Sequence, residues 1–298
     1  MGNIIVQYQK AYNTILEKLK GNESILAVMV FGSMITGDLW DESDIDLFVV
    51  MEMEHSEIKN IYTEENLVSI HIKLMSKEKF LLLHETDLPG GFIHRIFASS
   101  RLIFSKDIDV TTKYNNGRYY TDLDKERWNM VYLGNLIKNV SMCKKYRNNK
   151  GIHIAYTMCV KCMEDYAKLY INSSGYMISK DVITMAMNLN DDYKRSVDEL
   201  FFNKKDINVI IGNSVDYLEK VVNLSINTCT TLLMEFMRQK DCLLSSEDIV
   251  NDMLFKCFDI DVEGILNELW KRNMIKKGNR ELKYTNDKVL IKENVYFL

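Results

Sequence analysis

The sequence predicts an α+β protein in which a mixed sheet with flanking helices is followed by a helical region and then by a small unit of two helices and a β-hairpin. Three observations predict this order. Short apolar segments bounded by polar turns recur over residues 23–106. Apolar side chains then recur at helical spacing over residues 123–239. After residue 240, two short helical patterns precede two strand-like segments joined by a turn.

Composition places the chain among ordinary globular proteins. Of its 298 residues, 47% are hydrophobic and 27% are charged, and the length suggests about two or three domains. One proline and 13 glycines leave little room for linkers. We expect domains at residues 1–115, 120–240 and 241–298, with the polar segment 113–122 (KYNNGRYYTD) as the first boundary.

Charge, hydropathy and cysteine pattern exclude several classes of protein. No apolar run approaches the roughly 20 residues that span a bilayer, and the N-terminus lacks the pattern of a signal peptide. We therefore expect a cytoplasmic protein with no membrane partner. A net charge of −4 argues against a general polyanion binder. Cys159 and Cys162 form a lone C-x-x-C inside a helical pattern, which argues against zinc and redox roles, so we expect the six cysteines to be buried thiols.

The N-terminal elements follow from local patterns. Apolar residues at helical spacing predict a helix over residues 4–20, which Gly21 ends. Apolar or alternating segments predict strands, and short amphipathic segments predict helices between them. The expected strands are 25–31, 44–50, 67–74 and 101–104, and the expected further helices are 34–39, 77–84 and 92–98.

The remaining elements are predominantly helical. Three apolar stripes between residues 123 and 239 predict long helices with short loops, which is typical of a helical bundle. Ser245-Ser246-Glu247-Asp248 is an N-cap signal for a helix through Phe255. A helix over 262–272 and strands over 281–284 and 289–292 follow. This order is that of the end of a winged helix-turn-helix, so we expect a winged-helix-like C-terminal unit. Its last 28 residues carry eight Lys or Arg against three Asp or Glu.

The residues best suited to chemistry surround the turn between the first two strands. Asp44 and Asp46 lie two apart at the start of a strand, so both carboxylates project from one face and can converge on one cation. Like charges held together repel, which favours a divalent metal between them, and carboxylate and phosphate oxygens suit Mg²⁺. Gly32 permits close backbone approach to a ligand, and Ser33 offers a hydroxyl and an N–H. A helix opening at Met34 would direct free N–H groups at a triphosphate.

The pattern of Gly32-Ser33 followed by Asp44-x-Asp46 resembles the G-S-x(n)-D-x-D/E signature of the polymerase-β nucleotidyltransferase superfamily. The resemblance covers residues 23–106, and the layout is similar to the aminoglycoside (kanamycin-type) and minimal nucleotidyltransferases. It implies that Gly32 and Ser33 hold the β and γ phosphates of a nucleoside triphosphate and that Asp44 and Asp46 are catalytic ligands of Mg²⁺. It also implies in-line attack of a substrate hydroxyl on the α-phosphorus, with release of pyrophosphate.

Two features of that family have no counterpart in this sequence. The family's third carboxylate falls, by strand alternation, at Ser69, and His71 shares its face. Glu64 and Glu65 precede this strand and would substitute only in a shifted register. The family's carboxylate base on the first bundle helix is also missing, because the corresponding stretch reads Leu133-Gly134-Asn135-Leu136.

Three further sets of polar residues are weaker candidates. His94-Arg95 follows a glycine turn and would either reach phosphates or form a solvated helix face. Glu164-Asp165 would either supply a general base or be a surface pair. Arg118 lies at the domain boundary, where it could close over a nucleotide.

Two functions from different classes stay open. The first is a Mg²⁺-dependent enzyme that moves a nucleoside monophosphate, AMP from ATP, onto a hydroxyl of a small antibiotic-like molecule or of a protein. The second is a catalytically impaired, nucleotide-binding regulator whose winged-helix tail binds DNA or a partner. The intact Gly32-Ser33 and Asp44-x-Asp46 favour the first, and the basic tail favours the second. The sequence leaves the acceptor and the oligomeric state open.

Overall fold

The computed structural model describes residues 2–37, 39–40, 42–53, 58–86, 90–119, 121–283 and 289–298. The chain divides into two compact units, Met1–Thr121 and Asp122–Leu298. The first unit therefore ends inside the polar segment 113–122, although the last helix of that unit continues into this segment as far as Asn116. A further division between residues 240 and 241 stays a prediction.

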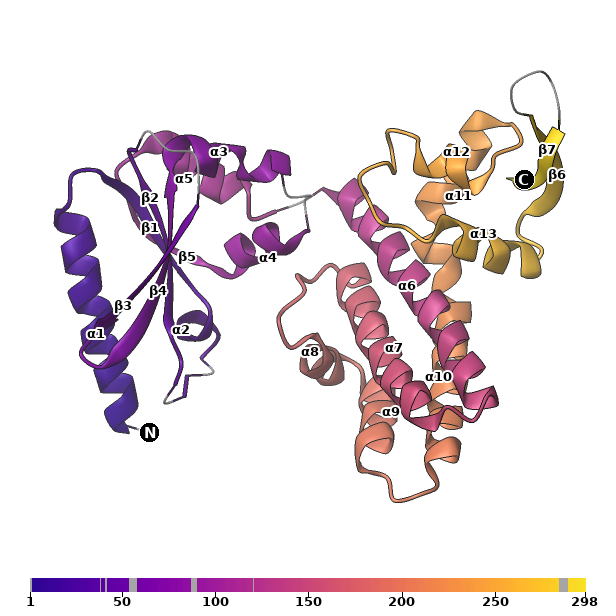
Figure 1. The fold of residues 1–298 in the computed structure, drawn as a ribbon, viewed down its shortest axis with the longest axis horizontal. Helices are drawn as coiled ribbons and strands as arrows, with labels where there is room; N and C mark the ends of the chain where they lie inside the picture. The colour runs from indigo at the N-terminus through magenta and orange to yellow at the C-terminus, as the bar shows by residue number, and fades with distance from the viewer. Residues whose placement is uncertain are drawn as a thin grey trace. The chain divides into compact units, whose positions relative to one another are not determined.

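The N-terminal unit is a five-stranded mixed sheet with helices on both faces (Figure 1). The strand order is β3-β4-β2-β1-β5, in which β2 and β4 are parallel and the other neighbours are antiparallel. In chain order the elements are α1 (Gly2–Gly21), β1 (Ile25–Phe31), α2 (Ser33–Thr36), β2 (Ile45–Met51), β3 (Lys59–Glu65), β4 (Val68–Ser76), α3 (Lys77–Thr86), α4 (Phe92–Ser99), β5 (Arg101–Ser105) and α5 (Ile108–Asn116).

Both faces of the central strands are buried, which explains why β1 and β2 are almost continuously apolar. Alternate residues such as Ile45 and Leu47 pack with α1 in one core cluster. The intervening residues, such as Phe48 and Val50, pack with α3, α4 and α5 in a second cluster. Asp46 shares the alternation of Phe48, so the second face carries the carboxylate at the start of β2.

The α+β class, the mixed sheet and the flanking helices are confirmed, and two local predictions are wrong. Strand β3 was not predicted, because its sequence KNIYTEE is largely polar and six of its seven residues are exposed. Helix α2 is limited to Ser33–Thr36, since Gly37 adopts a left-handed conformation and closes it after one turn. Asp38 of the predicted helix 34–39 and Tyr284 of the predicted strand 281–284 lie outside the described residues, as do Asp41 and Pro89.

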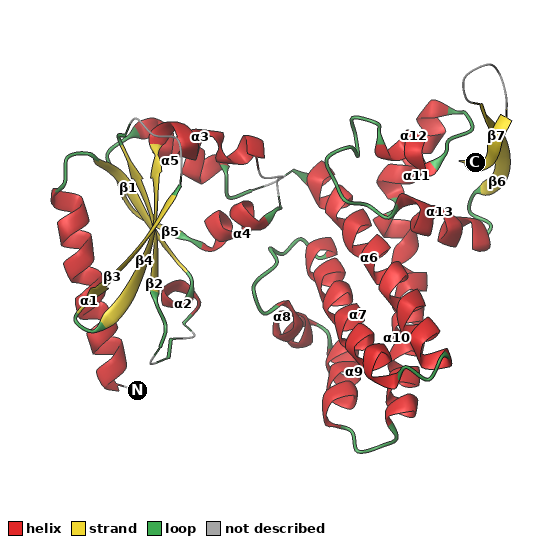
Figure 2. Ribbon diagram, viewed as in Figure 1, coloured by secondary structure: helices red, strands yellow, loops and turns green. Residues whose placement is uncertain are grey.

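The C-terminal unit contains the predicted long helices and ends in a two-stranded sheet (Figure 2). Helices α6, α7 and α10 pack against one another and form the centre of a bundle. In chain order the elements are α6 (Asp122–Asn148), α7 (Ile152–Ser173), α8 (Val182–Leu189), α9 (Asp191–Phe202), α10 (Ile207–Cys229), α11 (Thr231–Lys240), α12 (Ser246–Val250), α13 (Val262–Lys271), β6 (Lys276–Lys283) and β7 (Val289–Phe297).

The last part of this unit has the predicted order of helix, helix and hairpin. Ser245 and Asp248 form the predicted capping box of α12. That helix ends at Val250 rather than at Phe255, because the chain then turns at Asp252, whose side chain accepts from the Leu254 N–H at 3.0 Å. The hairpin strands are longer than predicted, since β6 begins at Lys276 rather than at Glu281 and β7 extends to Phe297 rather than to Lys292.

Candidate active site

The site begins with an unusual backbone conformation directly after β1. Gly32 has φ 74° and ψ −151°, a region that is essentially restricted to glycine. The chain then makes a single helical turn, in which the Ile35 N–H donates to Gly32 O at 2.9 Å and the Gly37 N–H donates to Ser33 O at 2.9 Å. The N–H groups of Ser33 and Met34 stand at the start of this turn, where intrahelical acceptors do not exist. A four-residue helix is too short to form the N-terminal phosphate site that was expected at Met34. The donors at this turn are therefore the N–H groups of Ser33 and Met34 themselves.

Gly32 lies directly against the Asp46 carboxylate. Asp46 pairs with Phe31 across the β1–β2 ladder, which places it beside the end of β1. A Cβ atom at position 32 would lie 2.5 Å from Asp46 Oδ2, well inside van der Waals contact. The absence of a side chain at Gly32 therefore makes room for the carboxylate.

Ser33 and Asp44 meet on the other side of the same turn. The Ser33 hydroxyl lies 3.5 Å from Asp44 O, at the limit of a hydrogen bond. Asp44 is exposed, whereas the Asp46 side chain is 24% exposed. Of the four predicted site residues, Gly32 and Asp46 are thus in contact, and so are Ser33 and Asp44.

A tyrosine from α1 fixes the loop that precedes the two acids. The buried Tyr8 hydroxyl is directed at Trp40 O, at 3.1 Å, and at Ser43 O. The Trp40 N–H also donates to the Ser43 hydroxyl at 3.1 Å. Sequence reasoning assigned Tyr8 to the apolar face of a helix and missed this contact, because nothing in the sequence relates Tyr8 to a loop more than 30 residues away.

An imidazole on β4 contacts Asp46 from the neighbouring strand. His71 is the direct partner of Asp46 in the parallel β2–β4 ladder, and its Nδ1 lies 3.2 Å from Asp46 Oδ1. Its Nε2 lies 3.1 Å from the side-chain amide of Asn60 on β3. Tyr62, also on β3, stacks on the imidazole with ring centroids 4.7 Å apart and planes 6° apart. Alternation placed His71 on the correct face, whereas Asn60 and Tyr62 were missed with the strand that carries them.

The place of the family's third carboxylate carries a hydroxyl. Ser69 is exposed on β4, and it precedes His71 on the same face of the sheet. Glu64 pairs with Ser69 across the β3–β4 ladder and so lies beside it without any shift in register. Glu65 is committed elsewhere, since it forms an ion pair with Lys18 of α1.

The donor groups fit a cation that arrives with a nucleotide better than a resident metal. In the part of the chain that the structure describes, no cluster of three or more His, Cys, Asp or Glu side chains could hold a metal ion. The carboxylates of Asp44 and Asp46, together with phosphate and water oxygens, would make the ligand set that Mg²⁺ prefers. These residues therefore fit a metal–triphosphate complex.

The weaker candidates of the N-terminal unit have structural roles. His94 is buried, and its Nδ1 accepts from the Gly90 N–H at 3.0 Å. Arg95 donates to Gly90 O at 3.0 Å, so both residues hold the turn before α4. Arg118 lies over the Tyr114 ring, 5.5 Å from its centroid, and donates to Ala98 O. His94 and Arg95 thus have partners in the turn before α4, whereas Arg118 keeps a buried Nε that has no hydrogen-bond partner among the described residues.

Glu164 and Asp165 of the bundle do not form a surface pair, because Asp165 is buried. Asp165 is 5% exposed and accepts from Asn139 Nδ2 at 2.6 Å, and burial raises the pKa of its carboxyl. Glu164 instead forms an ion pair with Lys168 on the same helix. A Cβ at Gly134 would lie 3.2 Å from the Asp261 backbone nitrogen, so the stretch in which the sequence lacks the family's base is packed there against the start of α13.

The cysteines differ from the prediction at two positions. Cys159 and Cys162 are buried on α7, and burial raises the pKa of the Cys162 thiol. Cys143 and Cys229 are buried as well. Cys242 and the remaining thiol, Cys257, are exposed, because both lie in irregular segments that flank the short helices of the C-terminal region.

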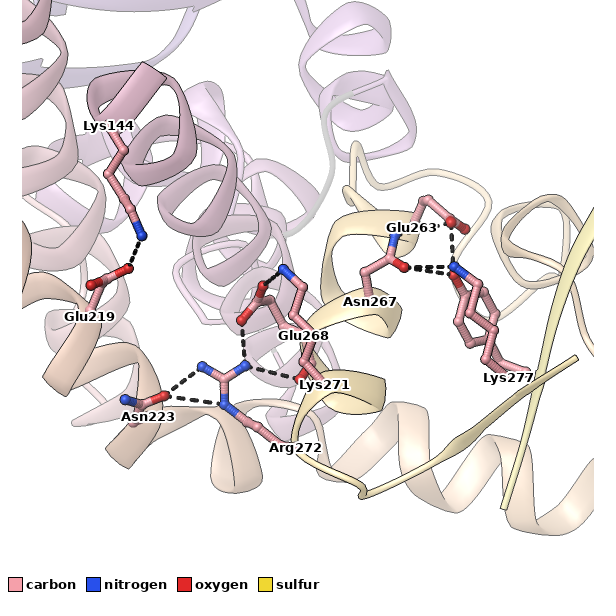
Figure 3. A network of polar contacts seen from close by, with 10 residues as sticks. Lys144, Glu219, Asn223, Glu263, Asn267, Glu268, Lys271, Arg272 and Lys277 are labelled. Atoms are coloured by element: carbon pink, nitrogen blue, oxygen red, sulfur yellow. Dashed lines mark hydrogen bonds and ion pairs between the residues drawn. The ribbon is translucent and has the colours of Figure 1, made fainter. Parts of the chain in front are cut away.

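Basic side chains of the tail are occupied by contacts within the C-terminal unit (Figure 3). Arg272 contacts Glu268 and Asn223, and Lys271 contacts Glu268 at 2.7 Å. Two further cations of the tail, Lys277 and Arg280, have partners of the same kind. Lys277 lies 2.9 Å from Asn267 and over the rings of Trp270 and Tyr296, and Arg280 forms ion pairs with Asp248 and Glu293. These internal contacts reduce the positive charge that is available to a polyanion.

Comparisons with known proteins give a family match for the N-terminal unit and a solved structure with a shared fold. Residues 13–109 match the family model described as "Polymerase beta, Nucleotidyltransferase". A nucleotidyltransferase-like protein from Exiguobacterium sibiricum 255-15 is similar in structure, with a TM-score of 0.64 and 14% identity over 97% of this chain and 99% of that chain, which shows a shared fold. A spectinomycin adenyltransferase from Enterococcus faecialis, solved with ATP and spectinomycin, has a TM-score of 0.31 and 15% identity over 72% of this chain and 99% of that chain. No curated protein matches the chain. Across the described residues, no helix has the length and apolar character needed to cross a membrane.

Proposed function

We propose that this chain, whose residues 13–109 belong to the polymerase-β-type nucleotidyltransferase superfamily, transfers a nucleoside monophosphate from a metal-bound triphosphate to an acceptor hydroxyl. The observation that carries the proposal is the contact between the Gly32 backbone and the Asp46 carboxylate at adjacent ends of β1 and β2. It puts backbone donors for phosphate and an acid for a cation side by side.

Each predicted residue receives a role from its position. The N–H groups at the start of α2 and the Ser33 hydroxyl would donate to the β and γ phosphates. Asp44 and Asp46 would hold Mg²⁺, the cation that arrives with the triphosphate. When bound, that cation supplies orientation of the reacting groups and neutralisation of charge on the attacking and leaving oxygens. Tyr8 holds the Trp40–Ser43 loop and so limits the movement of Asp44.

The proposed reaction is an in-line displacement. The acceptor hydroxyl gives up its proton to solvent and its oxygen forms a bond to the α-phosphorus, while the bond between that phosphorus and the bridging oxygen breaks and pyrophosphate leaves. We propose ATP as the donor, AMP as the transferred group and a hydroxyl of a small molecule or protein as the acceptor. His71 does not serve as the base in this arrangement, since Asp46 and Asn60 hold both of its ring nitrogens.

The regulatory alternative receives less support from the tail. A DNA-reading surface needs exposed cations that are free to neutralise phosphates. Arg272 and Lys277 instead contact acids and amides of their own unit (Figure 3). Arg280 forms ion pairs with Asp248 and Glu293 of the same unit. The contacts therefore favour a tail that stabilises its own unit.

Transfer of label tests the proposed function directly. The protein would be incubated with ATP labelled at the α-phosphate, Mg²⁺ and a panel of aminoglycosides, lincosamides and cell lysate. We expect a labelled product together with pyrophosphate, and loss of both with EDTA or with Asp46→Asn, which keeps the shape of the side chain but removes its charge. Label transfer that persists in Asp46→Asn would contradict the assigned role.

A further inference from the structure

We infer that His71 is a positioning residue that orients the Asp46 carboxylate for the cation, an inference that rests on the proposed function. The two residues are direct partners in the β2–β4 ladder, and Nδ1 of the imidazole lies 3.2 Å from Asp46 Oδ1. A carboxylate can only accept, so the imidazole donates in this contact. One oxygen of Asp46 is thereby fixed, and the other is directed toward the Gly32 turn.

The imidazole is itself held on two further sides. Asn60 lies 3.1 Å from Nε2, and the Tyr62 ring stacks on the imidazole face. The His71 side chain is 15% exposed, whereas Tyr62 is 74% exposed. The tyrosine thus covers the imidazole while most of its own surface meets solvent. An imidazole restrained by a ladder, an amide and a ring has little freedom to rotate away from Asp46.

This arrangement gives the edge strand β3 a role in the site. Asn60 and Tyr62 project from the same face of β3 as the partners they meet on β4, because antiparallel neighbours share a face. The side chains therefore form a row across three strands, from Tyr62 through His71 to Asp46. Groups that hold a metal-ligating side chain in this way typically change metal affinity by about 10–100-fold when they are removed.

The test measures metal affinity rather than turnover. Binding of Mn²⁺ would be followed by electron paramagnetic resonance in the presence of α,β-methylene-ATP, for wild type and variants. His71→Leu removes the donor and is expected to weaken Mn²⁺ binding about 10–100-fold. His71→Asn keeps an N–H donor toward Asp46 and is expected to restore most of the affinity.

Two variants of β3 provide the second arm and its control. Asn60→Ala should weaken Mn²⁺ binding several-fold, and its effect should be much smaller in a His71→Leu background, because both substitutions act through the same contact. Lys59→Ala, on the adjacent residue but the opposite face, should leave the affinity unchanged. If His71→Leu does not fold, Asn60→Ala decides the question.

The possible outcomes separate the two claims. If Asp46→Asn loses Mn²⁺–nucleotide binding while His71→Leu and Asn60→Ala bind as wild type does, the positioning role is wrong and the proposed function stands. The positioning role is also wrong, with the proposed function unaffected, if His71→Asn binds Mn²⁺–nucleotide no better than His71→Leu does. If wild type and Asp46→Asn bind equally, the proposed function itself fails.

Discussion

Replacing Gly32 with alanine perturbs the point on which the proposed site depends. With φ 74° and ψ −151°, the backbone of this residue lies where non-glycine residues cost about 1–3 kcal/mol. The new methyl group would also lie 2.5 Å from Asp46 Oδ2, so the carboxylate would have to move by about 1 Å to reach ordinary contact. The substitution therefore combines a loss of stability with a displaced ligand.

The two effects can be separated by measurement. Urea unfolding should show a loss of about 1–3 kcal/mol in the free energy of unfolding. A displacement of 1 Å in a reacting group can cost about 100-fold in rate, so kcat/KM should fall by about that factor in the protein that remains folded. Initial rates measured at saturating and at limiting ATP would supply kcat and kcat/KM.

Gly37 offers a matched control in the same turn. It has φ 82° and ψ 7°, so alanine there costs roughly 1–2 kcal/mol for the left-handed conformation. An added Cβ would meet no atom of the described residues within 4 Å, and Asp46 would not move. We expect Gly37→Ala to lose stability and to keep its kcat/KM within a few-fold. Equal losses of kcat/KM in the two variants, or no loss in Gly32→Ala, would refute this reasoning.

Three further outcomes are expected. Tyr8→Phe removes the hydroxyl that contacts Trp40 O and Ser43 O and should lower the free energy of unfolding by about 1–3 kcal/mol. The variant should also bind Mg²⁺–ATP more weakly in a calorimetric titration. Unchanged binding would show that the segment before Asp44 needs no such restraint. Asp165→Asn should raise the free energy of unfolding most at neutral pH. Burial raises the pKa of the Asp165 carboxyl, so its ionisation opposes folding as the pH rises above the ordinary pKa of aspartate. The gain in free energy of unfolding should vanish below that pKa, and a gain that stays constant across this pH range in urea unfolding would contradict the assignment. Fluorescence anisotropy with random duplex DNA at low salt should show no tight binding, because Arg272, Lys277 and Arg280 are held by partners within their own unit. Tight binding that weakens steeply with salt, with a slope of about −0.9 in log K against log salt for each phosphate contact, would contradict this expectation.

Local patterns predicted the parts of the fold that depend on burial. The strands β1 and β2 are buried on both faces, so their continuous apolar sequence could be recognised directly. Strand β3 could not be recognised from the sequence, because a polar edge strand with most residues exposed shows no alternation of apolar and polar side chains. The same limit hid Asn60 and Tyr62, whose contacts with His71 depend on that strand.

The candidate site was predictable as a set of residue types but not as a set of contacts. Gly32, Ser33, Asp44 and Asp46 were identified from spacing alone, whereas the pairing of Asp46 with His71 depends on the register between two strands that are not adjacent in sequence. Gly134 shows the same limit in the bundle. Its close approach to Asp261 leaves little room for a side chain at position 134, and more than a hundred residues separate the two positions.

The central claim is that Gly32, Ser33, Asp44 and Asp46 together hold a metal–triphosphate complex. Calorimetric titration of wild type and Asp46→Asn with α,β-methylene-ATP, each with Mg²⁺ and with EDTA, tests it most directly, because binding is measured without an acceptor. We expect saturable binding to wild type that requires Mg²⁺, and its loss in Asp46→Asn with the stability to urea preserved. Binding of equal affinity to both proteins, or binding that is unaffected by EDTA, would contradict the claim.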